Sequence, residues 1–192
     1  NLTFKQPNLD GPVSIQLDTE MGNGTQAAYF LWYFEEDWEV RTRLVTVDLF
    51  DPWTNRIIHY DYPPVAQGWC YRATDQILLG TTESNVENRM VGKTIQTIQN
   101  SDERLSVLYS IRLQQRTLSR QEYEYYQVQA KLNNEMGGLF TPQPSELPTN
   151  ITCSNHSRKV IGYVGCNMGV IDRQLYVSEE EVFYRDSYNC DL

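Results

Sequence analysis

The sequence predicts a mainly β protein, in which antiparallel strands form a β-sandwich and one α-helix is inserted late in the chain. The 192 residues include 13 Tyr and 4 Trp, and aromatic residues favour sheets. Apolar and polar residues alternate with a period of two in several short segments. Only the segment at about 120–136 carries helix start and stop signals. Many short strands with one helix are typical of an immunoglobulin/fibronectin-like sandwich rather than of alternating βαβ units.

The first half of the chain contains several strand signals. In the segment 12–19, apolar residues alternate with polar ones, as in a strand with one buried face. A glycine-containing turn at 21–26 precedes the longest β-type run, at 29–47. The core face of that run is predicted to hold Phe30, Trp32, Phe34, Glu36, Trp38 and Val40. A turn at 51–55 then leads into a short strand at 57–62, which Pro63 and Pro64 end.

Further strands are predicted at 77–82, 94–99 and 104–114. The segment 104–114 is interpreted as a central strand because apolar residues occupy almost every second position in it. Closing strands are predicted at 159–164 and 174–177. Before them, the prolines of the segment 140–148 indicate an extended crossing without sheet hydrogen bonds.

The helix start is predicted from local chemistry. Ser119 can cap the first free amides, Glu122 completes a capping box, and Leu118 can pack on Tyr123 as a hydrophobic staple. Gly137, followed by another glycine, supplies the stop signal. We therefore expect one domain over residues 1–192, with a helical and proline-rich insertion at 118–150.

Charge and hydropathy exclude some partners. The formal net charge of −9, without any Lys/Arg run, disfavours binding to nucleic acid phosphates. No apolar stretch approaches the roughly 20 residues that cross a bilayer, and the start of the chain lacks the pattern of a signal peptide. We expect a mature form or a soluble fragment.

The four cysteines are Cys70, Cys153, Cys166 and Cys190. Their even number and wide spacing are compatible with two disulfides, in any of three pairings, or with reduced thiols for at least one pair. A zinc site would need Cys153, His156 and Cys166 around one ion, but no second closely spaced pair supports it, so we predict no metal and no cofactor. Four Asn-x-Ser/Thr sequons would be glycan acceptors only in a eukaryotic secretory pathway.

Several short sequence motifs in the chain resemble those of a known family. They are WYFEEDWE at 32–39, LSVLYSIRLQQ at 105–115, LSRQEYEYY at 118–126, GGLFTPQPS at 137–145, NITC at 150–153 and VIGYVG at 160–165. Together they resemble the Bacteroidota outer-membrane lipoproteins of domain of unknown function 4249. The resemblance implies a lipid anchor outside this chain, a preceding small β-sandwich domain, and genes beside TonB-dependent outer-membrane receptors. It carries no catalytic or binding residue across.

The residues favour a protein without catalytic apparatus. A Ser or Cys nucleophile requires a histidine base, and His59 and His156 lie in a strand-like segment and a polar loop. A glycosidase needs paired carboxylates, for which the cluster at 35–39 is the best candidate. Glu36 alone falls on the aromatic face there, where a carboxylate must be paired or have a raised pKa. We interpret Glu36 as a structural ion-pair or hydrogen-bonding residue beside Trp38.

Exposed aromatic side chains are candidates for ligand binding, because a flat ring can cover the apolar face of a sugar. An aromatic side chain also has few rotamers, so it loses little conformational entropy when it binds. The candidates are Trp53, Tyr60, Tyr62 and Trp69, although core and sheet packing is the alternative for each. We expect a non-enzymatic envelope module that binds a small ligand such as a glycan or peptide and associates with a TonB-dependent receptor. The alternatives are a carbohydrate-active enzyme and a purely structural or adhesive surface domain.

Overall fold

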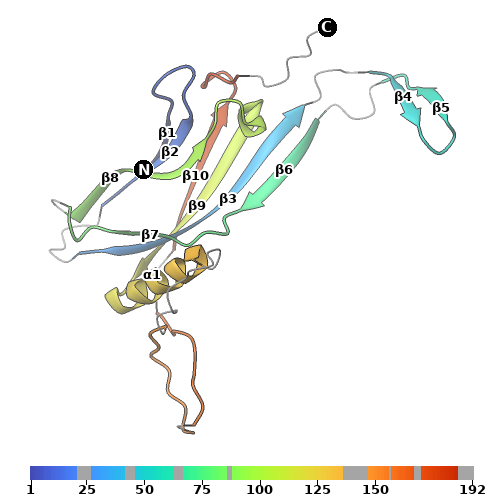
Figure 1. Ribbon diagram of the computed structural model, residues 1–192. Helices are drawn as coiled ribbons and strands as arrows, with labels where there is room; N and C mark the ends of the chain where they lie inside the picture. The colour runs from blue at the N-terminus through green and yellow to red at the C-terminus, as the bar shows by residue number, and fades with distance from the viewer. Residues whose placement is uncertain are drawn as a thin grey trace.

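The computed structural model describes residues 1–20, 27–41, 46–62, 67–85, 88–135, 147–155, 157–166 and 170–185. Over these residues the chain is mainly β, with antiparallel strand pairing and one α-helix, as the sequence predicts (Figure 1). The predicted features at 21–26, Pro63–Pro64, Gly137–Gly138 and 140–146, together with His156 and Cys190, lie outside the described residues.

Three sheets are present in the described residues. The first has the order β1-β2-β8, formed by Leu2–Lys5, Val13–Glu20 and Arg89–Ile98. The second has the order β10-β9-β3-β6, formed by Val170–Ser178, Leu108–Leu118, Tyr29–Arg41 and Gln67–Ala73. Strand β7 (Leu78–Thr81) pairs with the beginning of β3 and completes five strands. A separate hairpin pairs β4 (Asp48–Asp51) with β5 (Arg56–His59).

Strand β3 is the centre of the five-stranded sheet. It pairs with β9 along almost its whole length, from Tyr29 opposite Leu118 to Glu39 opposite Leu108. Its second half also pairs with β6, where Glu36 lies opposite Arg72. Because side chains alternate between the two faces of a strand, the even-numbered residues of β3 point to the core and the odd-numbered ones to the other face. We call that other face, on β3, β6, β9 and β10, the outer sheet face.

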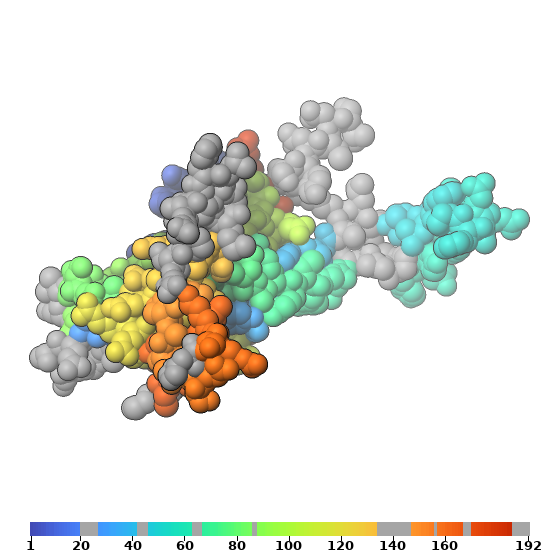
Figure 2. Space-filling view, turned by 60° about the horizontal axis from the view of Figure 1, so that its bottom comes forward, coloured from blue at the N-terminus to red at the C-terminus, as the bar shows by residue number. Residues whose placement is uncertain are grey.

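The β4–β5 hairpin stands away from the body of the protein. Figures 1 and 2 show it, in cyan, to one side of the two larger sheets in both views. Among the described residues, β4 and β5 pack extensively only against each other. The helix α1 (Arg120–Glu135) instead packs against β3 and β7 at the opposite end of the five-stranded sheet.

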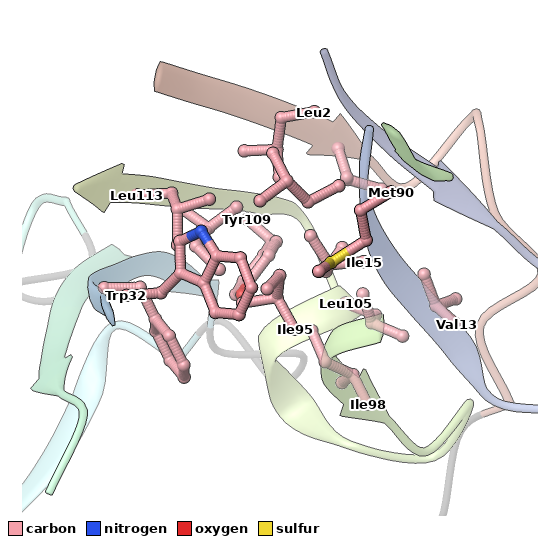
Figure 3. Close-up of a cluster of buried hydrophobic side chains, with 14 of the residues drawn as sticks. Leu2, Val13, Ile15, Trp32, Met90, Ile95, Ile98, Leu105, Tyr109 and Leu113 are labelled. Atoms are coloured by element: carbon pink, nitrogen blue, oxygen red, sulfur yellow. The ribbon is translucent and has the colours of Figure 1, made fainter. Parts of the chain in front are cut away.

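The two larger sheets contribute side chains to one hydrophobic core (Figure 3). Val13, Ile15 and Leu17 come from the first sheet, and Trp32 and Tyr109 are the largest fully buried side chains from the second. Trp32 fits because Gly80 lies beside it: a Cβ at that position would overlap the indole ring. The indole N–H donates to Gln115 Oε1 at 3.1 Å, so the ring is buried without an unpaired donor.

The structure corrects several predicted strand boundaries. The central strand begins at Leu108 instead of residue 104, because Glu103–Leu105 form a 3-10 helix capped by the Asp102 side chain. The strand predicted at 159–164 is wrong: those residues are in neither helix nor strand. The side chain of Asn150 accepts from the Val164 amide at 2.9 Å and donates to the Val164 carbonyl at 2.8 Å. An asparagine side chain therefore supplies bonds that a neighbouring strand would otherwise make.

Candidate functional site

A buried carboxylate lies at the middle of β3. Glu36 has no solvent-exposed surface, and four side chains donate to its two oxygens. Arg104 and Tyr109 each reach Oε1 at 2.8 Å, and Gln96 reaches the same oxygen at 3.2 Å. Arg72 binds Oε2 through Nε at 2.9 Å and Nη2 at 2.7 Å. The carboxylate is thus paired with two guanidinium groups, and both of its oxygens accept hydrogen bonds.

Asp102 holds the inner arginine in place. It accepts from Arg104 Nε at 2.9 Å and Nη2 at 2.7 Å, and also from the Arg104 amide at 3.1 Å. Burial by itself lowers the pKa of Arg104, but the bonds to Asp102 and the charge of Glu36 outweigh burial and raise it. Burial also raises the pKa of the Tyr109 phenol, and the adjacent charge of Glu36 adds to that effect. Arg104 therefore stays cationic and Tyr109 stays a neutral donor.

This arrangement suits a structural role better than an acid–base role. A glycosidase carboxylate must reach the scissile bond, and a second carboxylate must lie across that bond. Glu36 is closed off from solvent, whereas Glu35 and Asp37 point to the outer sheet face. Glu39 is also buried, and it accepts from Arg41 Nε at 2.8 Å. Neither cavity described below is lined by Glu36.

Other residues assigned structural roles from the sequence lie at the core edge and the helix start. Trp38 packs on the core from the face of Glu36, and its indole N–H has no hydrogen-bond partner among the described residues. Ser119 Oγ accepts from the Glu122 amide at 3.2 Å, as a helix N-cap does. The Glu122 carboxylate is buried against Gly165, where a Cβ would overlap it. The helix start therefore also contacts the segment 157–166.

Three of the four predicted ligand-binding aromatics, Trp53, Tyr60 and Tyr62, lie on or beside the β4–β5 hairpin. Trp53 is in the turn and is 94% exposed. We call the exposed apolar side chains of this region the hairpin surface. It consists of Leu49, Phe50, Trp53, Ile57, Ile58, Tyr60 and Tyr62.

The turn of the hairpin is ordered by one carboxylate. Asp51 Oδ1 accepts from the Trp53 amide at 2.9 Å, and Oδ2 accepts from the Thr54 hydroxyl at 2.6 Å. These bonds, that of Thr54 foremost, lower the pKa of Asp51. Asn55 has a φ of 54°, a left-handed conformation that asparagine tolerates well. The turn thus presents Trp53 in a defined position outside the body of the protein.

The fourth predicted aromatic, Trp69, lies elsewhere, on the outer sheet face. There it joins three exposed tyrosines that the sequence interpretation did not single out, namely Tyr33, Tyr71 and Tyr176. The alternation in β3 already placed Tyr33 on the face opposite the core, so the sequence pattern could have indicated that Tyr33 is exposed. The pairing of Tyr71 and Tyr176 with neighbouring strands had no signal in the sequence.

The surface of the described residues includes two cavities that bear on the candidate sites. One has a volume of about 320 Å³ and is lined by Leu31, Trp32, Tyr33, Gln76, Ile77, Gln114, Arg116 and Tyr126. The other has about 370 Å³ and a more polar lining of Asn1, Asp18, Thr19, Arg89 and Arg173. The first brings Tyr126 of the helix to the end of the outer sheet face.

The structure does not contain two disulfides, which is one of the arrangements that the cysteine count allows. Cys70, Cys153 and Cys166 are free, and every pairing of four cysteines into two disulfides needs one bond among these three. Cys70 lies in β6 opposite Trp38, whereas the other two belong to the segment beside α1. Within the described residues, no group of His, Cys, Asp and Glu could hold a metal ion. No helix in this part of the chain has the length and apolar character of a membrane span.

The fold and these surfaces define an antiparallel β-sheet domain with a buried ion-pair network, an exposed apolar hairpin and an open aromatic sheet face. The chain belongs to the family described as Domain of unknown function (DUF4249), whose model matches residues 1–167. The match confirms the domain of unknown function 4249 that the sequence motifs indicated. Comparisons with curated proteins and with solved structures gave no match.

Proposed function

We propose that this chain is a non-catalytic accessory domain of an outer-membrane lipoprotein, and that it contacts a TonB-dependent transporter through the hairpin surface. Family membership supports this proposal, because the resemblance implies a lipid-anchored envelope protein encoded beside such transporters. We infer further that the two larger sheets are the layers of an immunoglobulin/fibronectin-like sandwich, since both supply side chains to one core.

The observation that carries the proposal is the apolar character of the hairpin on both of its faces. Phe50 lies opposite Ile57, and Leu49 lies opposite Ile58. Neighbouring residues of a strand point to opposite faces, so each face of the hairpin presents one apolar pair. An isolated two-stranded hairpin is marginally stable in water, and exposed apolar surface of this kind marks interaction sites. A partner that covers the hairpin would stabilise it.

The charges on the hairpin favour a protein partner over a lipid bilayer. Asp51 and Arg56 lie opposite each other next to the turn, and Asp48 binds His59 Nδ1 at 2.7 Å near the base. Insertion of Trp53 deep into hydrocarbon would carry Asp51 and Arg56 with it, which is costly. A protein surface can pair these charges while it packs on the aromatic rings.

The surroundings of Glu36 support the non-catalytic part of the proposal. Its oxygens are bound by Arg72, Arg104, Tyr109 and Gln96, and it has no access to solvent. A carbohydrate-active enzyme is the alternative, and it would have to use Glu35 or Asp37 on the outer sheet face. Turnover of a glycan that is abolished by Glu35→Gln or Asp37→Asn would contradict the non-catalytic proposal.

The docking proposal is tested by copurification. Full-length protein with an affinity tag is purified from native membranes, and the TonB-dependent barrel that accompanies it is quantified by mass spectrometry. Phe50→Ala combined with Trp53→Ala should reduce the recovered barrel about tenfold or more, because truncation of central aromatic anchors costs most of an interface's affinity. Trp69→Ala, an exposed tryptophan outside the hairpin, is the matched control and should recover as much barrel as the unmodified protein.

Equal recovery with the hairpin variant and the control would show that the hairpin does not dock. Absence of any such barrel from the unmodified sample would contradict the association itself.

A further inference from the structure

The outer sheet face places aromatic rings beside hydrogen-bonding groups in successive cross-strand rows. In one row, Asp37 lies between Tyr71 and Ser110, and Tyr176 lies on the far side of Ser110. In the next row, Glu35 lies opposite Arg112. Side chains directly opposite each other on antiparallel strands are close neighbours on the same face. The face therefore offers ring surfaces, acceptors and donors within a few ångströms of one another.

The face ends in a cavity at the helix. Tyr33 and Gln114, a cross-strand pair, belong to its lining, together with Ile77 on one side and Tyr126 of α1 on another. Its volume of about 320 Å³ lies within the range of ligand pockets, about 300–1,000 Å³. The cavity could enclose one end of an extended ligand while the rest of the ligand lies along the open face.

The length of the face suits an oligomer. From Leu31 in the cavity to Glu39 opposite Trp69, β3 advances eight residues, which at about 3.4 Å each spans roughly 27 Å. Tyr33, Tyr71 and Trp69 are exposed along this line. A ligand of several rings could thus contact an aromatic side chain at more than one point.

Several polar groups of the face are already oriented by their neighbours. Partial burial raises the pKa of the Tyr71 phenol, and the charge of Glu35 and hydrogen bonds with Glu35 and Tyr33 add to this effect. Arg112 Nη2 donates to Asp172 Oδ2 at 3.0 Å. The side chain of Arg116 belongs to the cavity lining, and in the described residues it makes no hydrogen bond or ion pair. Its donors and those of Gln76 and Gln114 are available to hydroxyl or carbonyl oxygens of a ligand.

We propose that the outer sheet face, with the cavity beneath α1, binds a neutral oligosaccharide. Rings of Tyr33, Tyr71 and Trp69 would cover the apolar faces of successive sugars, and the carboxylates of Glu35 and Asp37 would accept from sugar hydroxyls. A polyanionic glycan fits poorly, because Glu35 and Asp37 follow one another on this face of β3 and would repel it. A basic peptide is the competing ligand for such an acidic, aromatic surface.

This site is separate from the hairpin surface, so it does not depend on the docking proposal. Tyr33 and Trp69 belong to the five-stranded sheet, and Trp53 belongs to the hairpin. Loss of one interaction should leave the other unchanged.

Isothermal titration of the protein with cellohexaose, maltohexaose and chitohexaose tests the proposal. At least one of these neutral hexasaccharides should bind with a Kd below about 1 mM, and polygalacturonate and an oligolysine peptide should not. Tyr33→Ala and Gln114→Ala should each weaken that binding, Tyr33→Ala by about tenfold. Trp53→Ala should leave it unchanged, and a melting curve for each variant separates loss of the site from loss of the fold.

Three outcomes would overturn the proposal. They are no measurable binding of any of the three hexasaccharides, tighter binding of oligolysine or polygalacturonate, and hexasaccharide binding that Tyr33→Ala leaves intact in a folded variant. None of these outcomes bears on recovery of the transporter, which the hairpin variants test.

Discussion

Arg104 Nη1 lies 2.8 Å from Glu36 Oε1, although the two residues are 68 positions apart in the sequence. The Glu36 side chain has no exposed surface and that of Arg104 is 10% exposed. The pair thus connects the 3-10 helix at Glu103–Leu105 to the middle of β3. Because removal of one partner leaves the other charge buried, this pair makes the fold sensitive to single substitutions.

Glu36→Gln should destabilise the protein strongly. The change keeps the shape of the side chain but removes the countercharge shared by two guanidinium groups. Arg72 is half exposed and Arg104 keeps its bonds to Asp102, so we expect a cost of about 3 kcal/mol, at the low end of the range for a broken buried pair. For a chain of this size we expect the Tm to fall by roughly 10 °C. Urea unfolding followed by circular dichroism measures the free energy directly.

Glu35→Gln is the matched control, since it makes the same chemical change one residue away on the outer sheet face. A substitution there should alter the stability by no more than about 0.5 kcal/mol. Equal stabilities of the two variants and the unmodified protein would show that the buried network contributes nothing to the fold.

Acid should weaken the same network through Asp102. Burial by itself raises the pKa of Asp102, but the bonds from the Arg104 guanidinium and amide outweigh burial and hold it below the ordinary value of 3.8. A carboxyl with a lowered pKa contributes stability above its unfolded pKa and loses it as the pH falls through the folded value. The free energy of unfolding should therefore decrease below about pH 4, and Asp102→Asn should make that decrease shallower. If the free energy of unfolding of Asp102→Asn decreased in acid as steeply as that of the unmodified protein, Asp102 would not be the cause of the decrease.

Gly80→Ala should strain the core. A Cβ at position 80 would overlap the ring of Trp32, whose position is also set by its bond to Gln115. Overpacking of this kind costs about 1 to 3 kcal/mol. Gly68→Ala is the comparison, because its Cβ would meet only Val40, at an ordinary 3.7 Å. Melting curves of the two variants should differ, with Gly80→Ala lower; a difference in the opposite sense would refute the packing argument.

Ser119→Ala should loosen the start of α1. The substitution removes the oxygen that accepts from the Glu122 amide, at a cost of about 1 kcal/mol. Ser119→Asp retains an acceptor and should restore the stability. Hydrogen exchange of the first helical amides reports the effect locally, and equal exchange in the alanine and aspartate variants would contradict it.

Strands with one buried face could be predicted from the sequence, because their alternation follows from burial. Val13, Ile15 and Leu17 are fully buried in β2, and Phe30, Trp32 and Phe34 are buried in β3. Strands β4 and β6 were missed because exposed apolar residues occur on both faces of β4 and because Trp69 and Tyr71 of β6 are exposed. The segment 159–164 has strand-like residues, but its Val164 bonds to the side chain of Asn150 instead of to a neighbouring strand.

The candidate sites were predictable only in part. Alternation placed Glu36 among the core aromatics, but its partners Arg72 and Arg104 come from segments far along the chain that only the fold brings together. The aromatic residues Trp53, Tyr60 and Tyr62 were identified by type, whereas their common place on or beside one projecting hairpin depends on the pairing of β4 with β5. Tyr71 and Tyr176 join Asp37 and Ser110 in one row only through strand register.

Docking through the hairpin surface is tested most directly by site-specific photocrosslinking in native membranes. A photoreactive phenylalanine replaces Trp53 in one full-length protein and Trp69 in another, both exposed positions. We expect an adduct with a TonB-dependent barrel from position 53 and none from position 69. No barrel adduct at position 53, or equal adducts at both positions, would contradict the proposal.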